Sequence, residues 1–214
     1  MKKYELTTET LQFAGRTLHR IKAVKDFSSI EAGQFGGWIE NEKNLSQDDN
    51  AWIYGDAMAF DNANVFGNAK ILGNAIVYGN AVVHSNAKIY DYAKVYDKAN
   101  IYDNAEVYGN VRICGKATIK GDAKVNDTVD YIVFKNFWSS GRYFTWTRSN
   151  NKWSVGCFYG TGEELIKKAY ADSDTSGREY ERVVRYVESI LADERKKRII
   201  IINTKTIPMG YKYK

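Results

Sequence analysis

The chain has 214 residues, of which 44% are hydrophobic and 27% charged, and this balance excludes an intrinsically disordered protein. Its formal net charge of +5 is concentrated in residues 195–214, which contain basic but no acidic residues. No apolar stretch approaches the roughly 20 residues of a membrane span, and no signal-peptide core follows the N-terminus. Cys114 and Cys157 are too few for a disulfide framework, so we expect a cytoplasmic protein.

The first segment, residues 1–48, is expected to form a cap over the repeat that follows it. Residues 18–23 are predicted to form a strand, and residues 26–34 a loop or a short helical turn. Trp38, Ile39 and Leu45 are predicted to close the open end of the first coil, where backbone groups and apolar side chains have no neighbours.

From Asp49 to Asn126 the chain divides into thirteen consecutive six-residue units with no insertion. The third residue of each unit is Ala except Val111, the fifth is Ile or Val except Ala59, and the first is Gly, Asp or Ser. Such repetition determines the architecture of a chain. A period of six with a turn pair in every unit fits neither the 3.6-residue period of a helix nor the 3.5-residue period of a coiled coil.

Each unit predicts one short strand and one corner. The third and fifth side chains of a strand point to the same side and form an inner face, whereas the fourth and sixth point outward. Gly, Asn and Asp at the corner tolerate the left-handed backbone conformation. Three sides therefore close a triangular coil of eighteen residues, and coils stacked about 4.8 Å apart pair their backbone groups.

An aliphatic residue followed four positions later by a small one, as in Val77 with Ala81, resembles the hexapeptide pattern of left-handed β-helix proteins. The wider layout is similar to a group of phage, prophage and bacterial hexapeptide-repeat proteins. The matching features are the opening MKKYELTTET, the stretch LHRIKAVKDF, the GGWIE turn at residues 36–40 and the YGNA repeats. The resemblance implies a mainly β protein with a left-handed parallel β-helix over residues 49–126.

Sixth-position side chains three units apart are predicted to stack on the same outer face. The three series are Tyr54, Leu72, Tyr90 and Tyr108; Phe60, Tyr78, Tyr96 and Cys114; and Phe66, His84, Tyr102 and Lys120. Such a density of rings is unusual for solvent-facing sites; the rings either stabilise neighbouring coils or form a protein interface. Left-handed β-helix proteins commonly trimerise, so the resemblance implies a homotrimer. Its predicted interface residues are Tyr78, Tyr90, Tyr96, Tyr102 and Tyr108.

After Asn126 the period stops, and residues 127–194 are predicted to form a small α+β module. Residues 130–135, 142–147 and 153–159 read as three antiparallel strands. Thr161 and Glu164 form a capping box that predicts one helix, and Ser176 with Glu179 predicts a second that reaches about Ala192.

The module combines aromatic and basic side chains, which can stack on bases and neutralise phosphates. The candidate binding residues are Trp138, Arg142, Tyr143, Trp146, Arg148 and Lys152. Alternation along the strands requires about half of the aromatic residues to face inward, so a structural core and a protein-binding surface remain open alternatives.

Residues 195–214 form a basic and apolar tail. Its RKKR cluster is either solvated or in contact with nucleic acid or anionic lipid. Four exposed isoleucines would promote aggregation, so residues 199–202 are predicted to pair as a strand or to pack against a partner subunit.

Many left-handed β-helix proteins are acyltransferases that use a histidine as general base and bind acyl-CoA between subunits. This chain contains only His19 and His84, and no loop interrupts its repeats. His84 is the weak catalytic candidate, and its alternative interpretation is an aromatic substitute in a ladder of rings. The sequence predicts no metal site and no bound cofactor.

Three functions follow from these observations. The first is a noncatalytic binding or assembly protein, encoded by a phage or prophage as the resemblance implies, that presents a recognition module to a host protein or ligand and inhibits host defence. The second is a divergent acyltransferase. The third is a protein that binds or sequesters a nucleotide or nucleic acid.

Overall fold

The computed structural model describes residues 2–138 and 140–205. The described residues form two compact units, one containing residues up to Asn136 together with Gly141–Gly160, and the other containing Phe137, Trp138, Ser140 and the residues from Thr161. The sheet that follows the coil thus falls in the first unit, whereas the sequence groups it with the helices.

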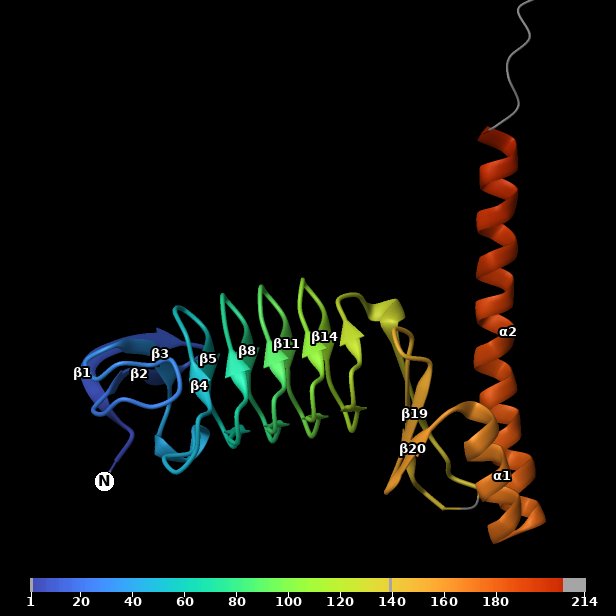
Figure 1. Cartoon of the computed structure of the whole chain (residues 1–214), viewed down its shortest axis with the longest axis horizontal. Coiled ribbons are helices and arrows are strands. Elements are labelled where there is room, and N and C mark those ends of the chain that lie inside the picture. Colours follow the sequence, from blue (N-terminus) through green and yellow to red (C-terminus); the bar gives the residue numbers. More distant parts are fainter. Residues whose placement is uncertain (1, 139, 206–214) are drawn as a thin grey trace, which may run out of the picture. The chain divides into compact units, whose positions relative to one another are not determined.

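Residues 49–126 fold as a left-handed parallel β-helix of short strands, with three flat faces (Figure 1). Face A consists of β5 (Met58–Ala59), β8 (Ile76–Val77), β11 (Lys94–Val95) and β14 (Arg112–Ile113). Face B consists of β4 (Trp52–Ile53), β7 (Lys70–Ile71), β10 (Lys88–Ile89), β13 (Glu106–Val107) and β16 (Lys124–Val125). Face C consists of β6 (Asn64–Val65), β9 (Val82–Val83), β12 (Asn100–Ile101) and β15 (Thr118–Ile119). The predicted triangular repeat is confirmed.

The interior and the corners follow the six-residue pattern. Third- and fifth-position side chains, such as Ala87 and Ile89, are fully buried. The first residue of each corner has positive φ where it is Gly, and also at Asp103 (φ 58°) and Ser85 (φ 57°). The Asp103 carboxylate also accepts a hydrogen bond of 3.1 Å from the amide of Gly121, one coil further on. Acidic corner residues therefore tie successive coils together.

The N-terminal cap extends face A. The hairpin of β1 (Tyr4–Phe13) and β2 (Arg16–Ala23) pairs with β3 (Phe35–Ile39), which runs parallel to β5. The strand predicted over residues 18–23 lies within β2. Gly37 is needed because a Cβ there would lie 2.4 Å from the carbonyl oxygen of Ala57. This close approach lets the Trp38 amide donate to that oxygen at 3.0 Å.

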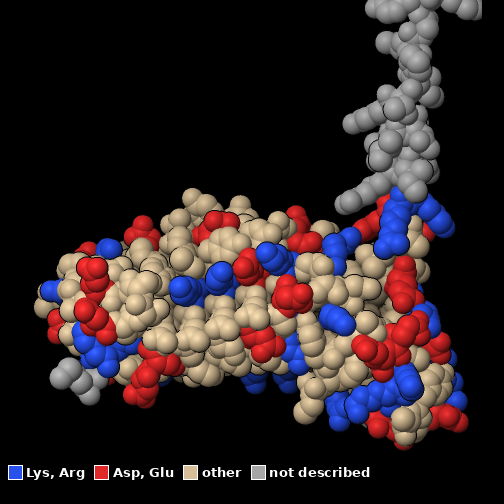
Figure 2. All heavy atoms as spheres, in the orientation of Figure 1, with Lys and Arg blue, Asp and Glu red and all other residues tan. Residues whose placement is uncertain are grey.

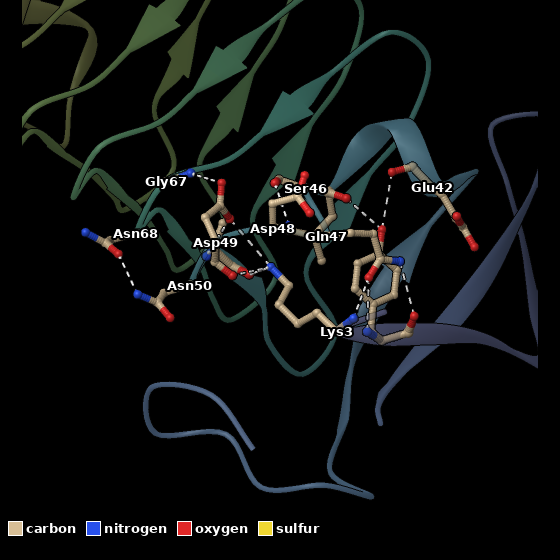
Figure 3. Close-up of polar contacts among 12 residues, drawn as sticks. Lys3, Glu42, Ser46, Gln47, Asp48, Asp49, Asn50, Gly67 and Asn68 are labelled. Carbon is tan, nitrogen blue, oxygen red and sulfur yellow. Dashed lines mark hydrogen bonds and ion pairs between the residues drawn. The ribbon is translucent and has the colours of Figure 1, made fainter. Parts of the chain in front are cut away.

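Cap side chains satisfy carbonyl groups of the first coil that have no preceding coil to pair with. The buried Lys3 ammonium donates to the carbonyl oxygens of Asp49 and Ala51, both at 2.9 Å, as Figure 3 illustrates for Lys3 and Asp49. On the next corner, buried Asn44 donates through its Nδ2 to the carbonyl oxygens of Asp61 (3.0 Å) and Ala63 (2.9 Å). The end of the coil is thus closed by hydrogen bonds as well as by apolar contact.

Two predictions for this end need correction. Ile39 and Leu45 lie in the core of the coil as predicted, but Trp38 packs outside it, in a cluster with Leu18, Phe60 and Ile76. Trp52 occupies a fourth position, expected to face outward, yet it is fully buried. Its ring lies 6.1 Å from that of Tyr4 and 5.4 Å from that of Phe27, because the cap folds over this side of the first coil.

The other end of the coil is closed by an antiparallel sheet of β17 (Tyr131–Lys135), β18 (Tyr143–Thr147), β19 (Lys152–Val155) and β20 (Phe158–Gly160). The last-coil amide of Thr118 donates to Thr145 Oγ1 (2.9 Å), and that of Lys124 donates to Ser149 Oγ (2.7 Å). The prediction of one strand over residues 153–159 is wrong: Gly156, with φ of 56°, starts a turn that divides the segment into β19 and β20.

The second unit contains α1 (Gly162–Asp172) and α2 (Asp174–Lys205), which pack together. The predicted capping box of Thr161 and Glu164 is present. Helix α2 begins two residues before Ser176 and continues past Ala192, so the strand predicted over residues 199–202 is wrong. The packing of those isoleucine side chains and the tail residues 206–214 lie outside the described residues. No helix in the described part of the chain is long and apolar enough to cross a membrane.

Candidate functional site: a groove on face A

The outer side of face A carries a shallow groove. Fourth-position side chains of successive coils form its floor in the order Met58, Ile76, Lys94 and Arg112. The adjoining corner contributes second-position side chains of the same units, in the order Asp56, Asn74, Tyr92 and Asn110. Together with Phe13 these residues enclose a hollow of about 480 Å³, within the range of small-molecule sites.

The tip of the β1–β2 hairpin supplies the opposite wall. The Phe13 ring lies 5.8 Å from the ring of Phe60, and Arg16 forms an ion pair with Asp61. Leu18 packs into the same cluster as Phe60 and Ile76. A smaller hollow of about 310 Å³ between the hairpin tip and the coil shares Phe13, Ile76 and Lys94 with the groove. The hairpin is therefore fixed against face A by apolar and ionic contacts.

Charge and polarity change along the groove. Its first coil presents Asp56 and Met58, the next presents Ile76, and the last two present Lys94 and Arg112. Within the described residues, neither of these two basic side chains has an ion-pair partner. Figure 2 shows acidic and basic side chains interspersed over the visible side of the coil. Lys94 and Arg112 therefore make one end of the groove locally positive, and they are not part of a broad basic surface.

His84 lies on face C, away from the residues that line the groove on face A. Its ring is stacked between those of Phe66 and Tyr102, with centroids 4.8 Å away on both sides. Its Nδ1 lies 3.0 Å from Ser85 Oγ. Burial lowers the pKa of His84, and the carboxylate of Asp103 acts in the opposite direction. The predicted stacking is confirmed, and a catalytic role for this ring remains a prediction.

The second histidine lies in the N-terminal hairpin. His19 Nδ1 is 3.4 Å from the carbonyl oxygen of Thr7 on the neighbouring strand. Within the described residues no carboxylate pairs with His19, and no group of three His, Cys, Asp or Glu side chains is placed to hold a metal ion. The groove on face A contains no histidine.

The six aromatic and basic residues of the C-terminal module do not form one exposed set. Trp146 is buried, and its Nε1 donates to Asn151 Oδ1 at 2.9 Å. Arg148 donates from Nε to the carbonyl oxygen of Val129 at 2.9 Å. The Lys116 ammonium lies over the ring of Tyr143, 4.9 Å from the ring centroid. Arg142 is exposed, Lys152 is half-buried, and Trp138 is 66% exposed in the second unit.

The five predicted interface tyrosines are half-buried in the single chain. Tyr78 and Tyr96 stack at 4.9 Å, and so do Tyr90 and Tyr108. Tyr102 stacks on His84. These contacts stabilise adjacent coils, whereas burial of a face by another subunit remains a prediction.

Sequence reasoning missed the groove. The sequence did contain a signal for its floor. The fourth residues of every third unit are Met58, Ile76, Lys94 and Arg112, which places two apolar and then two basic side chains on one face. The hairpin wall had no comparable signal, because the position of Phe13 depends on how the cap folds onto the coil.

Comparison with known proteins gives a limited match. No protein-family model matches the chain. A segment is 39% identical over 69 residues to the "Uncharacterized acetyltransferase YdcK" of Escherichia coli (strain K12). The match covers 28% of this chain and 21% of that protein. The six-residue repeat and the β-helix fold of the chain are consistent with this match. Because the similarity covers so little of either chain, it does not assign acetyltransferase activity to this protein.

Proposed function

We propose that this protein is a noncatalytic binding and assembly protein that uses its β-helix as a rigid scaffold. The observation that carries the proposal is the groove on face A, which joins an apolar floor to two cations without ion-pair partners among the described residues. The coil beneath it is uninterrupted and closed at both ends, so the spacing of the groove side chains is fixed by the backbone ladder.

The assembly part of the proposal concerns face C. Its fourth-position side chains are Asn64, Val82, Asn100 and Thr118, none of which is charged. Face B presents Lys70, Lys88, Glu106 and Lys124 at the same positions. Because charged residues are depleted at the centre of protein interfaces, face C with its adjacent stacked rings is the best candidate for the trimer contact.

The proposed cellular setting rests on the resemblance of the sequence to phage and prophage hexapeptide-repeat proteins. We propose that the groove or the C-terminal module engages a protein or small ligand of the host bacterium, to the benefit of a phage that encodes the chain. The free thiols of Cys114 and Cys157 are compatible with action in the cytoplasm.

The test is capture from bacterial lysate with the full chain, followed by native mass spectrometry of the captured material. A retained protein or small molecule that is lost in the Lys94→Glu/Arg112→Glu variant supports the proposal. The matched control is Lys70→Glu/Lys98→Glu, which makes the same change in charge outside the groove. Equal retention by both double variants would contradict binding in the groove.

A divergent acyltransferase is the alternative function, and the similarity to a protein named acetyltransferase favours it. His84 is its candidate base. Acetyl-CoA consumption with an acceptor, lost in a folded His84→Ala variant, would support the alternative. The same consumption in that variant would exclude His84 as the base.

A further inference from the structure

We propose that the groove on face A binds a nucleotide, with the aromatic base over Ile76 and the phosphate at Lys94 and Arg112. This inference rests on the proposed binding function and adds the chemical class of the ligand. Its basis is the order of side chains along four successive coils, which changes from acidic and apolar to aromatic and basic.

The phosphate end consists of Lys94 and Arg112. These residues are direct partners in the parallel pairing of β11 and β14, so their side chains leave adjacent coils in the same direction. An Arg guanidinium can bind two phosphate oxygens at once, and a neighbouring Lys ammonium adds a mobile donor. With no ion-pair partner in the described part of the chain, both remain available to an anion.

Rings border the two sides of the groove. Tyr92 on the corner is 60% exposed and stacks on no other ring among the described residues. Phe13 stands on the opposite wall, and Met58 and Ile76 form an apolar floor between them. Tyr92 belongs to the coil of Lys94, next to the coil of Ile76, so a planar base over Ile76 can pack against the Tyr92 ring. This interaction tolerates any base because each has a π-face.

Asp56 fixes the direction of the ligand. Its carboxylate repels a phosphate from the first coil of the groove and can accept hydrogen bonds from the amino and N–H groups of a base. Adjacent coils are about 4.8 Å apart. Ile76 lies one coil from Lys94 and two coils from Arg112, a separation of about 5–10 Å that matches the distance between the base and the phosphate of a mononucleotide.

This arrangement favours a nucleotide over other anions. A free phosphate would leave the ring wall unused, and an acidic peptide would place a second negative charge near Asp56. The hollow of about 480 Å³ is lined by side chains of the coil and by Phe13 of the hairpin. It accommodates one small molecule rather than a folded partner.

The experiment is isothermal titration calorimetry of the full chain with adenosine 5′-monophosphate, adenosine, inorganic phosphate and coenzyme A. We expect saturable binding of the monophosphate to one site per chain, at least tenfold tighter than adenosine or phosphate. Lys94→Glu/Arg112→Glu should abolish this binding, and Tyr92→Ala should weaken it about tenfold. Lys70→Glu/Lys98→Glu should leave it unchanged.

Three results would overturn the inference: no saturable binding of the monophosphate, equal affinity for phosphate alone, or equal loss of affinity in the control double variant. Binding of coenzyme A without binding of the monophosphate would also overturn it and support the acyltransferase alternative. If the monophosphate does not bind but Lys94→Glu/Arg112→Glu still loses a partner captured from lysate, the inference fails and the proposed function stands. Circular dichroism of each variant confirms that the coil is folded.

Discussion

The imidazole of His84 stacks on the phenol ring of Tyr102 with a centroid distance of 4.8 Å and an interplanar angle of 7°. The two residues occupy the same position in successive coils, so the stack follows directly from the eighteen-residue period. His84 thus takes the place of an aromatic residue in a ladder that continues to Phe66.

Replacing His84 tests this role. His84→Phe preserves the stack and should leave stability within about 0.5 kcal/mol of the wild type, whereas His84→Ala removes two ring contacts and should cost about 1–3 kcal/mol. Thermal or urea unfolding checks both values. Equal stability of the Ala and Phe variants would show that the ladder contributes nothing at this position.

The same site predicts a mild acid sensitivity. Burial lowers the pKa of His84 in the folded state, so protonation favours the unfolded state. Stability should therefore fall as the pH decreases from about 6.5 toward the lowered value. Unfolding curves between pH 7 and pH 5 measure this loss, and His84→Phe should show less of it. An identical slope in the variant would assign the acid sensitivity to other groups.

Lys3 should be a strong determinant of cap stability. Lys3→Met leaves the carbonyl oxygens of Asp49 and Ala51 without their donor and should destabilise the protein by about 2–4 kcal/mol. The matched control is Lys2→Met, because the Lys2 side chain is 62% exposed and its ion pair with Glu42 is at the surface. The control should change stability by less than about 1 kcal/mol. Similar losses in both variants, measured by urea unfolding, would refute the capping role.

Tyr131 predicts a loss of stability at alkaline pH. Burial raises the pKa of its hydroxyl to about 12, and that hydroxyl donates to the carbonyl oxygen of Arg112 at 2.8 Å. Its contribution is fully present below pH 10 and is lost as the pH rises from about 10 through about 12. Melting temperatures measured from pH 8 to pH 12 should fall less steeply for Tyr131→Phe. Parallel curves would mean that Tyr131 does not contribute to the alkaline transition.

Face C predicts how the chain assembles. Val82→Arg introduces a charge at the centre of this face and should convert the proposed trimer to single chains. Leu72→Arg introduces the same charge in the outer ladder of face B and should leave the trimer intact. Sedimentation analysis of both variants distinguishes the faces; dissociation by Leu72→Arg alone would move the interface to face B.

The coil could be predicted from the sequence because each residue's role depends on its position within six residues. Ala87 and Ile89 face inward, and Asp103 turns the corner, for local reasons. The capping box of Thr161 is equally local. Trp52 could not be placed in this way: its position points out of the coil, and only the folded cap buries it.

The candidate site was less predictable for the same reason. The aromatic and basic residues after residue 130 predicted Trp146 as a binding residue, but the sheet buries its side chain. The groove instead joins Phe13 to Lys94, residues far apart in the chain. Their proximity depends on the hairpin folding back along face A, which no local pattern indicates.

Native mass spectrometry of the full chain, purified from bacteria without added ligand, tests the central claim most directly because it reports assembly and retained ligand together. If the protein is a noncatalytic binding and assembly protein, the measured mass should equal three chains plus a bound molecule. The Lys94→Glu/Arg112→Glu variant should remain a trimer and lose the bound molecule. A mass equal to one 24.4 kDa chain, with nothing bound, would contradict the account.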